Sequence, residues 1–350
     1  MANRIDSMDQ FRGYTMAGMF LVNFVGSFAA VHALLKHHNT YHSYADTIMP
    51  HFFFAVGFSL RLVMLRNIEQ KGSAAAYRKA VIRSLILVLV GMVVYHLDGK
   101  YKTWADLTSL GWSGFFATAF WRTSFQALVH IGVTSLWVLP VIARSARVRI
   151  AFMVGTGALH LALSYWFWYD LLREKRIIDG GPLGFLTWAI PALAGSLAFD
   201  LVRDRGARGA LKPLVIWGAV LAFFGYGLSC LGGLAAPPFW APWGPVNIWT
   251  MSQQAGANSY LWFSAGFSLL VYAGFVWWTD VGGRQWSLFR VFGVNPLAGY
   301  VLHDLIAEAV KPFGPSDSPL WWVGFVFAVY FGILWLFLWG LDRQRIYIRL

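Results

Sequence analysis

Apolar runs long enough to cross a lipid bilayer recur from one end of this chain to the other. An α-helix needs about 20 predominantly apolar residues to span the hydrocarbon core. Because lipid offers the backbone no hydrogen-bond partners, such runs fold as helices. The sequence predicts about ten spans, at 11–33, 47–65, 82–97, 123–143, 149–169, 185–202, 213–232, 258–279, 286–306 and 319–341. The aromatic segment 104–121 is short for a span, and an interfacial helix and a re-entrant stretch both fit it.

The composition supports the same class of protein. Of the 350 residues, 58% are hydrophobic and only 13% are charged, whereas a water-soluble domain carries about 25% charged residues. No signal-peptide cleavage site is evident after the first apolar run, and most loops between the spans are short. We therefore predict an all-α, polytopic membrane helix bundle that forms one domain over residues 1–350.

The basic residues predict the orientation in the bilayer. Most of the 28 Lys and Arg residues fall on the side of the N-terminus, and cytoplasmic loops carry an excess of these residues. Both termini are therefore expected in the cytoplasm. The net charge of +12 reflects this topology, so no nucleic-acid partner is expected. The lack of a large outer domain favours a multi-pass protein of a bacterial inner membrane, and a homo-oligomer is left open.

Histidines collect on the opposite, outer side of the predicted bundle. Histidine is the side chain that titrates nearest neutral pH, and ionisable groups at the rim of apolar spans are costly and hence functional candidates. The outer histidines are His32, His37, His38, His42, His51, His96 and His303. No regular ligand spacing on one helix supports a zinc site, so no metal is expected. The chemistry is predicted on the outer side.

Several short motifs occur along the chain in the same order as in a known family, and they carry a resemblance to it. They are RIDSMDQFRG at 4–13, MFLVNF at 19–24, KHHNTYHSYADTIMPHFFFAVG at 36–57, SFQALVHIG at 124–132, DGGPLG at 179–184, NIWTMS at 247–252 and FGVNPLAGYVLH at 292–303. Together they resemble the heparan-α-glucosaminide N-acetyltransferase family of transmembrane acyltransferases, in its bacterial branch. The resemblance extends over nearly the whole chain.

The resemblance implies transfer of an acetyl group from cytosolic acetyl-CoA to a glucosamine amine across the membrane. An outer histidine and an asparagine at the end of the first span are the family's catalytic pair. Asn23 matches the asparagine. His38 keeps the family's aromatic residue three positions later, at Tyr41, but its distance to Asp46 is shorter than in the family. His37 is the alternative, and the choice between the two stays open.

The chemistry of these residue types fits that placement. An amine must lose a proton as it attacks a thioester carbonyl, and a histidine serves as the general base. Asp46 is expected to orient the imidazole, and Asn23 to donate a hydrogen bond to the developing oxyanion. We expect direct transfer within a ternary complex, with an acetyl-histidine intermediate as the alternative mechanism.

Further residues are assigned to the two substrates through the same resemblance. Contacts with acetyl-CoA are expected from Asp9, Arg12, Gln126, Asn295 and Tyr300, and contacts with the acceptor from His42, Asn247, Trp249 and His303. Structural alternatives exist for several of them. Asp9 and Arg12 are three residues apart, so they share a helix face and an ion pair between them is equally expected. Asn295 precedes Pro296 and fits a helix N-terminus.

Two other classes of function remain after the sequence is read. A transporter of amino sugars or oligosaccharides also needs polar groups between its helices, but no inverted repeat is visible. A membrane scaffold leaves the outer histidines unexplained. The acceptor is open as well: free glucosamine, a peptidoglycan fragment, another glycan amine and an O-acyl acceptor all fit.

Overall fold

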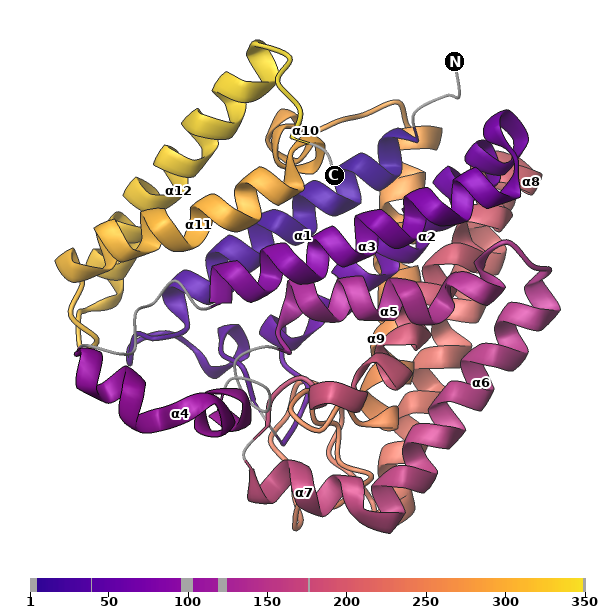
Figure 1. The fold of residues 1–350 in the computed structure, drawn as a ribbon. Helices are drawn as coiled ribbons and strands as arrows, with labels where there is room; N and C mark the ends of the chain where they lie inside the picture. Colours follow the sequence, from indigo (N-terminus) through magenta and orange to yellow (C-terminus); the bar gives the residue numbers. More distant parts are fainter. Residues whose placement is uncertain (1–4, 39, 96–102, 119–124, 176, 349–350) are drawn as a thin grey trace.

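The computed structural model describes residues 5–38, 40–95, 103–118, 125–175 and 177–348. Within these ranges the chain forms helices joined by loops, without a strand (Figure 1). The helices are α1 Asp6–Val25, α2 Ile48–Lys71, α3 Ser73–Tyr95, α4 Trp104–Thr118, α5 Ala127–Ile142, α6 Ala146–Leu163, α7 Tyr169–Glu174, α8 Phe185–Ser229, α9 Asn258–Phe275, α10 Ser287–Val294, α11 Pro296–Val310 and α12 Leu320–Arg343. The predicted all-α class is confirmed for the described residues.

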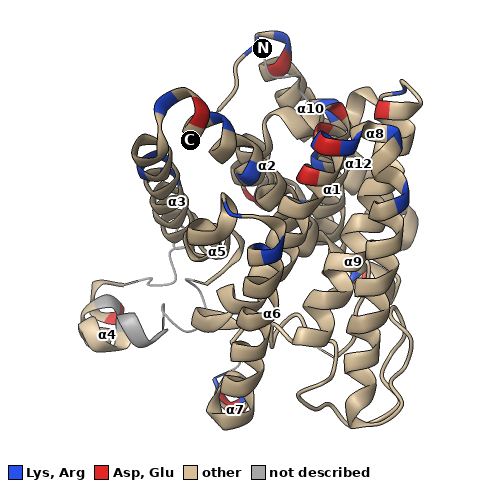
Figure 2. Cartoon of the chain, turned by 90° about the vertical axis from the view of Figure 1, so that its right-hand side faces the viewer, with Lys and Arg blue, Asp and Glu red and all other residues tan. Residues whose placement is uncertain are grey.

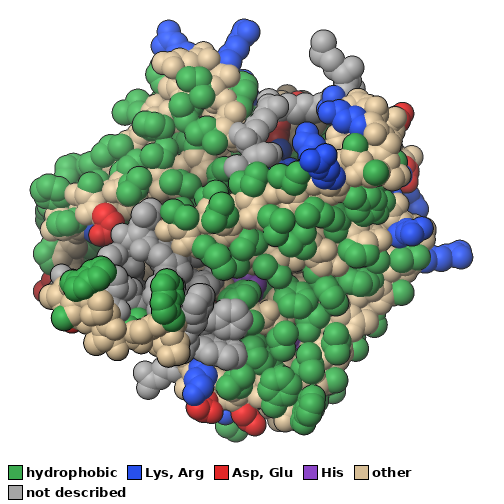
Figure 3. Space-filling model, viewed as in Figure 1, with side chains coloured by type: hydrophobic (Ala, Val, Ile, Leu, Met, Phe, Trp, Pro, Cys, Tyr) green, Lys and Arg blue, Asp and Glu red, His purple; other side chains and the backbone are tan. Residues whose placement is uncertain are grey.

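Five helical segments of the described chain are long and apolar enough to cross a membrane. They are Ala45–Lys71, Ala146–Glu174, Gly181–Gly232, Asn258–Val281 and Leu320–Arg343. Helix α5 is apolar but shorter. Hydrophobic side chains also cover most of the face shown in Figure 3, whereas Lys and Arg lie mainly at its edges. These features are those of a membrane protein.

The longest helix, α8, is two helices that meet at a corner. Gly206 has φ 68° and ψ 170°, a conformation that glycine adopts without the steric penalty of a Cβ atom. The two arms coincide with the predicted spans 185–202 and 213–232. One candidate segment of 52 residues therefore corresponds to two of the predicted spans.

Two predicted boundaries are wrong. Helix α1 ends at Val25, not near residue 33, because Gly26 is a poor helix former and the chain after it turns back in short 3-10 turns at Ala33–Leu35 and Ala45–Thr47. The continuous span 286–306 is interrupted: α10 ends at Val294 and α11 begins at Pro296. The residue before a proline is disfavoured in the α conformation, so the helix breaks there.

Helix α4 lies at the periphery of the bundle (Figure 2). Trp104 and Trp112 are 78% and 81% exposed, and Gly111 interrupts the helix with φ 61°. Tryptophan is enriched at membrane–water interfaces. These features favour the interfacial helix over the re-entrant stretch for this segment.

The centre of the bundle is held by close approaches between helix backbones. A Cβ atom added to Gly57 of α2 would lie 1.7 Å from the carbonyl oxygen of Ala192, and one added to Gly195 of α8 would lie 1.9 Å from that of Phe54. Small residues let membrane helices pack this closely. The two glycines thus fix α2 against the first arm of α8.

The two ends of the bundle differ in charge and in the loops that they carry. Both chain termini lie at one end, and Lys and Arg gather there (Figure 2). The loops that connect α1 to α2, α7 to α8 and α8 to α9 gather at the other end (Figure 1). The motif residues of these loops therefore meet away from the basic end.

Candidate functional site

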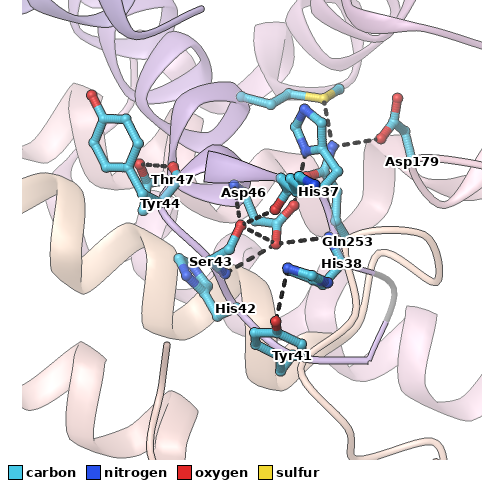
Figure 4. Close-up of polar contacts among 12 residues, drawn as sticks. His37, His38, Tyr41, His42, Ser43, Tyr44, Asp46, Thr47, Asp179 and Gln253 are labelled. Carbon is cyan, nitrogen blue, oxygen red and sulfur yellow. Dashed lines mark hydrogen bonds and ion pairs between the residues drawn. The ribbon is translucent and has the colours of Figure 1, made fainter. Parts of the chain in front are cut away.

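The loop between α1 and α2 is wrapped around the carboxylate of Asp46, which is 1% exposed. Its Oδ1 lies 2.9 Å from Nδ1 of His37. Its Oδ2 accepts hydrogen bonds from the Ser43 N–H at 3.0 Å, the Ser43 hydroxyl at 2.9 Å and the His38 N–H at 3.4 Å (Figure 4). A buried carboxylate requires such donors. Asp46 is therefore the fixed centre of this loop.

The two candidate histidines have different surroundings. The His37 side chain is 49% exposed. Because a carboxylate only accepts, Nδ1 carries the proton in the neutral ring, and Nε2 then keeps a lone pair. The His38 ring is stacked on Tyr41 with ring centroids 4.1 Å apart. Its Nε2 lies 2.8 Å from both the Ala33 carbonyl oxygen and the Tyr41 hydroxyl. The structure therefore pairs the Asp46 carboxylate with the ring of His37, whereas the ring of His38 contacts Ala33 and Tyr41.

Asp46 also changes the basicity of His37. Burial by itself lowers the pKa of His37, but the hydrogen bond and the negative charge of Asp46 raise that pKa above its ordinary value. An opposite charge nearby favours the protonated imidazole. His37 is thus a stronger proton acceptor than an isolated histidine.

A second carboxylate joins this cluster from distant parts of the sequence. Nε2 of Gln253 donates to Oδ1 of Asp179 at 2.8 Å, and Figure 4 shows both residues beside His37. The Tyr260 hydroxyl donates to the backbone oxygen of Asp46 at 2.6 Å. Asp179, Gln253 and Tyr260 are not among the site residues predicted from the sequence. The available signal was their position: Asp179 opens the DGGPLG motif, and Gln253 directly follows NIWTMS.

Asn23 lies in a different set of contacts. Its Nδ2 is 3.3 Å from Nε2 of His303, and that nitrogen is also 3.2 Å from Oδ1 of Asp304. The other ring nitrogen of His303 hydrogen-bonds to the Tyr300 carbonyl oxygen. Among the contacts of the described residues, none joins Asn23 to His37 or Asp46. The structure therefore pairs the predicted asparagine with His303.

The other predicted acceptor residues belong to the framework of the outer loops. His42 is 1% exposed, its Nε2 lies 3.0 Å from the Ser264 hydroxyl, and burial lowers its pKa to about 4. Oδ1 of Asn247 accepts the Trp249 N–H at 2.9 Å, which closes a local turn. Trp249 packs edge-on against Tyr165. These contacts shape the long loop 233–257.

A groove of about 790 Å³ is lined at one part by basic residues. Its walls come mainly from α1, α2, α3, α5 and α11, and its basic lining residues are Arg12, Arg66, Lys71, Lys79 and Arg83. Asp9 and Tyr300 line it too, and Asp9 forms an ion pair with Arg12. Three of the residues predicted to bind the cofactor thus share one groove.

The two remaining cofactor candidates are placed differently. The buried Asn295 side chain donates to the Ile346 carbonyl oxygen at 2.9 Å and accepts the Ile348 N–H at 3.1 Å. It therefore secures the C-terminal segment, while its neighbours Val294 and Pro296 line the groove. Gln126 directly precedes α5 and is not among the groove residues.

The groove follows α2 toward the outer loops. Its lining on α2 runs from Lys71 to Phe52, a length of about 28 Å at a rise of about 1.5 Å per residue. One turn beyond Phe52, the sulfur of Met49 lies 3.8 Å from Nε2 of Gln253. The lining on α2 thus ends about one helical turn before Met49, the residue that contacts Gln253.

No protein-family model matches this chain, and no curated protein matches it. The family resemblance therefore depends on the motifs alone.

Proposed function

We propose that this chain is a polytopic membrane acetyltransferase. It transfers an acetyl group from acetyl-CoA on the cytoplasmic side to the amine of glucosamine, or of a glucosamine-containing glycan, on the periplasmic side of a bacterial inner membrane. In this proposal the chain crosses the membrane about ten times, with both termini in the cytoplasm. The observation that carries it is the His37–Asp46 pair, with an exposed imidazole at the end opposite a cation-lined groove.

The groove fits the donor in charge and in polarity. Acetyl-CoA has anionic phosphates at one end and a long, thin arm that ends in the thioester. Arg12, Lys79 and Arg83 offer positive charge to the phosphates, and the apolar side chains along α2 and α3 suit the arm. Its lining extends about 28 Å along α2, which is about the thickness of the hydrocarbon core of a bilayer. We therefore assign the donor to it.

The outer cluster supplies the acid–base chemistry. Nε2 of His37 takes a proton from the attacking amine, and Asp46 holds the ring in the required tautomer and stabilises its charged form. Asn23 is assigned to the thioester oxygen, with His303 as the residue that orients its amide. Transfer is direct, and labelled acetyl trapped on the protein without acceptor would instead support an acetyl-histidine intermediate.

Proteoliposomes test the proposal. Vesicles that enclose acetyl-labelled acetyl-CoA and receive glucosamine outside should release labelled N-acetylglucosamine outside. Uptake of unmodified sugar would identify a transporter. If neither acetylated product nor sugar uptake is observed, both functions are rejected.

The two histidines offer a matched pair of variants for the same assay. His37→Ala should lower kcat by about 10² to 10⁴, the usual contribution of a general base. His38→Ala should stay within about tenfold of the wild type, because that ring is bound within its own loop. The reverse order would assign the base to His38.

A further inference from the structure

Asp179 is held in the outer cluster by an unusual backbone conformation. Its φ is 55°, a region that few residues other than glycine adopt. Its carbonyl oxygen accepts the Trp188 indole N–H at 2.8 Å, and the next residue, Gly180, donates its N–H to the Gln254 carbonyl oxygen at 2.9 Å. The loop between α7 and α8 is thus joined to the loop between α8 and α9 next to Asp179, whose carboxylate lies in the cluster. Such a conformation is retained where the surrounding structure requires it.

The two carboxylates of the cluster are not equally satisfied. Asp46 is fully buried and receives hydrogen bonds on both oxygens. Asp179 is half-buried, and its side chain has one hydrogen bond from the described residues, the one from Gln253. The titratable groups that face it are His37, Asp46 and Tyr260. Asp179 therefore has capacity to accept a further donor beside the exposed imidazole.

We propose that Asp179 binds the ammonium form of the acceptor amine and takes its first proton. This inference rests on the proposed function, and it narrows the acceptor to amines that are protonated near neutral pH. An amine that arrives as an ammonium ion must lose two protons to become an amide. His37 alone accepts only one of them.

The complete step balances with these two residues. One N–H proton passes from R–NH₃⁺ to the Asp179 carboxylate and leaves R–NH₂ with a lone pair. The lone pair attacks the thioester carbonyl carbon, so the C–N bond forms, and the second N–H proton passes to Nε2 of His37. The C–S bond breaks and its electron pair stays on sulfur. The CoA thiolate then takes this second proton from Nε2 of His37 and leaves as the thiol. Asp179 releases its proton to water.

The environment of Asp179 suits this exchange. Burial raises the pKa of Asp179 to about 6, although the Gln253 hydrogen bond and the charge of His37 oppose the increase. A carboxylate whose pKa lies near the working pH is a more effective proton acceptor than one with an ordinary value.

The test compares two nucleophiles in the Asp179→Asn variant. Glucosamine is an ammonium ion near neutral pH, whereas hydroxylamine is neutral there and needs only His37. The variant should lower kcat/KM for glucosamine at least about tenfold more than kcat/KM for hydroxylamine. Above about pH 8, where bulk solvent supplies free amine, the difference should shrink. Asparagine tolerates positive φ better than most residues, so the backbone should remain in place.

The controls separate this inference from the proposed function. Asp170→Asn removes an exposed carboxylate of α7 and should leave both reactions unchanged. An equal loss for the two nucleophiles, or a difference that does not depend on pH, would overturn the role of Asp179. If the wild type transfers acetyl to neither nucleophile, the proposed function itself has failed.

Discussion

Replacement of Asp46 by asparagine tests how the site sets the state of His37. The side chain keeps its shape in Asp46→Asn, but one oxygen becomes an NH₂ group. The oxygen that faces Ser43 and His38 meets three donors, so the amide oxygen has to point there. The NH₂ group must then face Nδ1 of His37, which becomes an acceptor. The proton moves to Nε2, and the lone pair that serves as the base is lost.

The magnitude follows from these contacts. Loss of the correct tautomer removes general-base catalysis, which contributes about 10² to 10⁴ in rate. Three hydrogen bonds to a charged acceptor become bonds to a neutral one, and charge-assisted bonds are about twice as strong as neutral ones. We therefore expect a loss of about 1–3 kcal/mol in the free energy of unfolding. The catalytic effect should exceed the effect on stability.

The assay is acetyl transfer to glucosamine by purified protein in detergent, with thermal unfolding measured on the same sample. ¹⁵N chemical shifts of the histidine rings report the tautomer of His37 directly. Ser43→Ala is the matched control, because it removes one donor and keeps the carboxylate, and it should cost less than about tenfold in kcat. A folded Asp46→Asn variant that keeps kcat within about threefold of the wild type would refute the reasoning.

Three further outcomes are expected. Asp46 raises the pKa of His37 in the folded protein. The stabilisation from this pair should therefore be fully present below about pH 6.5, the pKa of histidine in the unfolded chain, and should be lost as the pH rises through the higher pKa of the folded protein. The free energy of unfolding measured across that pH range checks the sign. Gly57→Ala places a Cβ atom 1.7 Å from the Ala192 carbonyl oxygen and should destabilise the protein by about 1–3 kcal/mol. Gly155→Ala, with open space around its Cβ position, should not. Equal melting temperatures of the two variants would contradict the close packing. Arg83→Gln should raise KM for acetyl-CoA about two- to fivefold at low salt with kcat unchanged, and an unchanged KM would remove Arg83 from the donor site.

Part of the fold was accessible from the sequence because it depends on local hydropathy. The predicted spans 258–279 and 319–341 agree with Asn258–Val281 and Leu320–Arg343 to within a few residues. The predicted span 286–306 was continuous and did not include the break between α10 and α11, although Pro296 is the local cause of that break. The early end of α1 was missed because apolar residues continue past Gly26.

The site divides in the same way. Asp46 and both candidate histidines lie in one loop, so a contact between Asp46 and one of the two was predicted from the sequence, but the sequence left open which one. Asp179 and Gln253 are 74 positions apart, and they meet only because the loops after α7 and α8 pack together. The partner of Asn23 is 280 positions away, and no spacing rule identifies it.

The sequence by itself determined that this chain is helical and that its apolar helices suit a membrane, because both properties follow from the order of apolar side chains along the chain. The tertiary structure decided which imidazole meets the carboxylate, which second carboxylate lies beside it, and that a cation-lined groove runs along α2 toward them. Those choices depend on backbone approaches such as Gly57 against Ala192 and on hydrogen bonds between loops distant in sequence, which form only once the helices have packed.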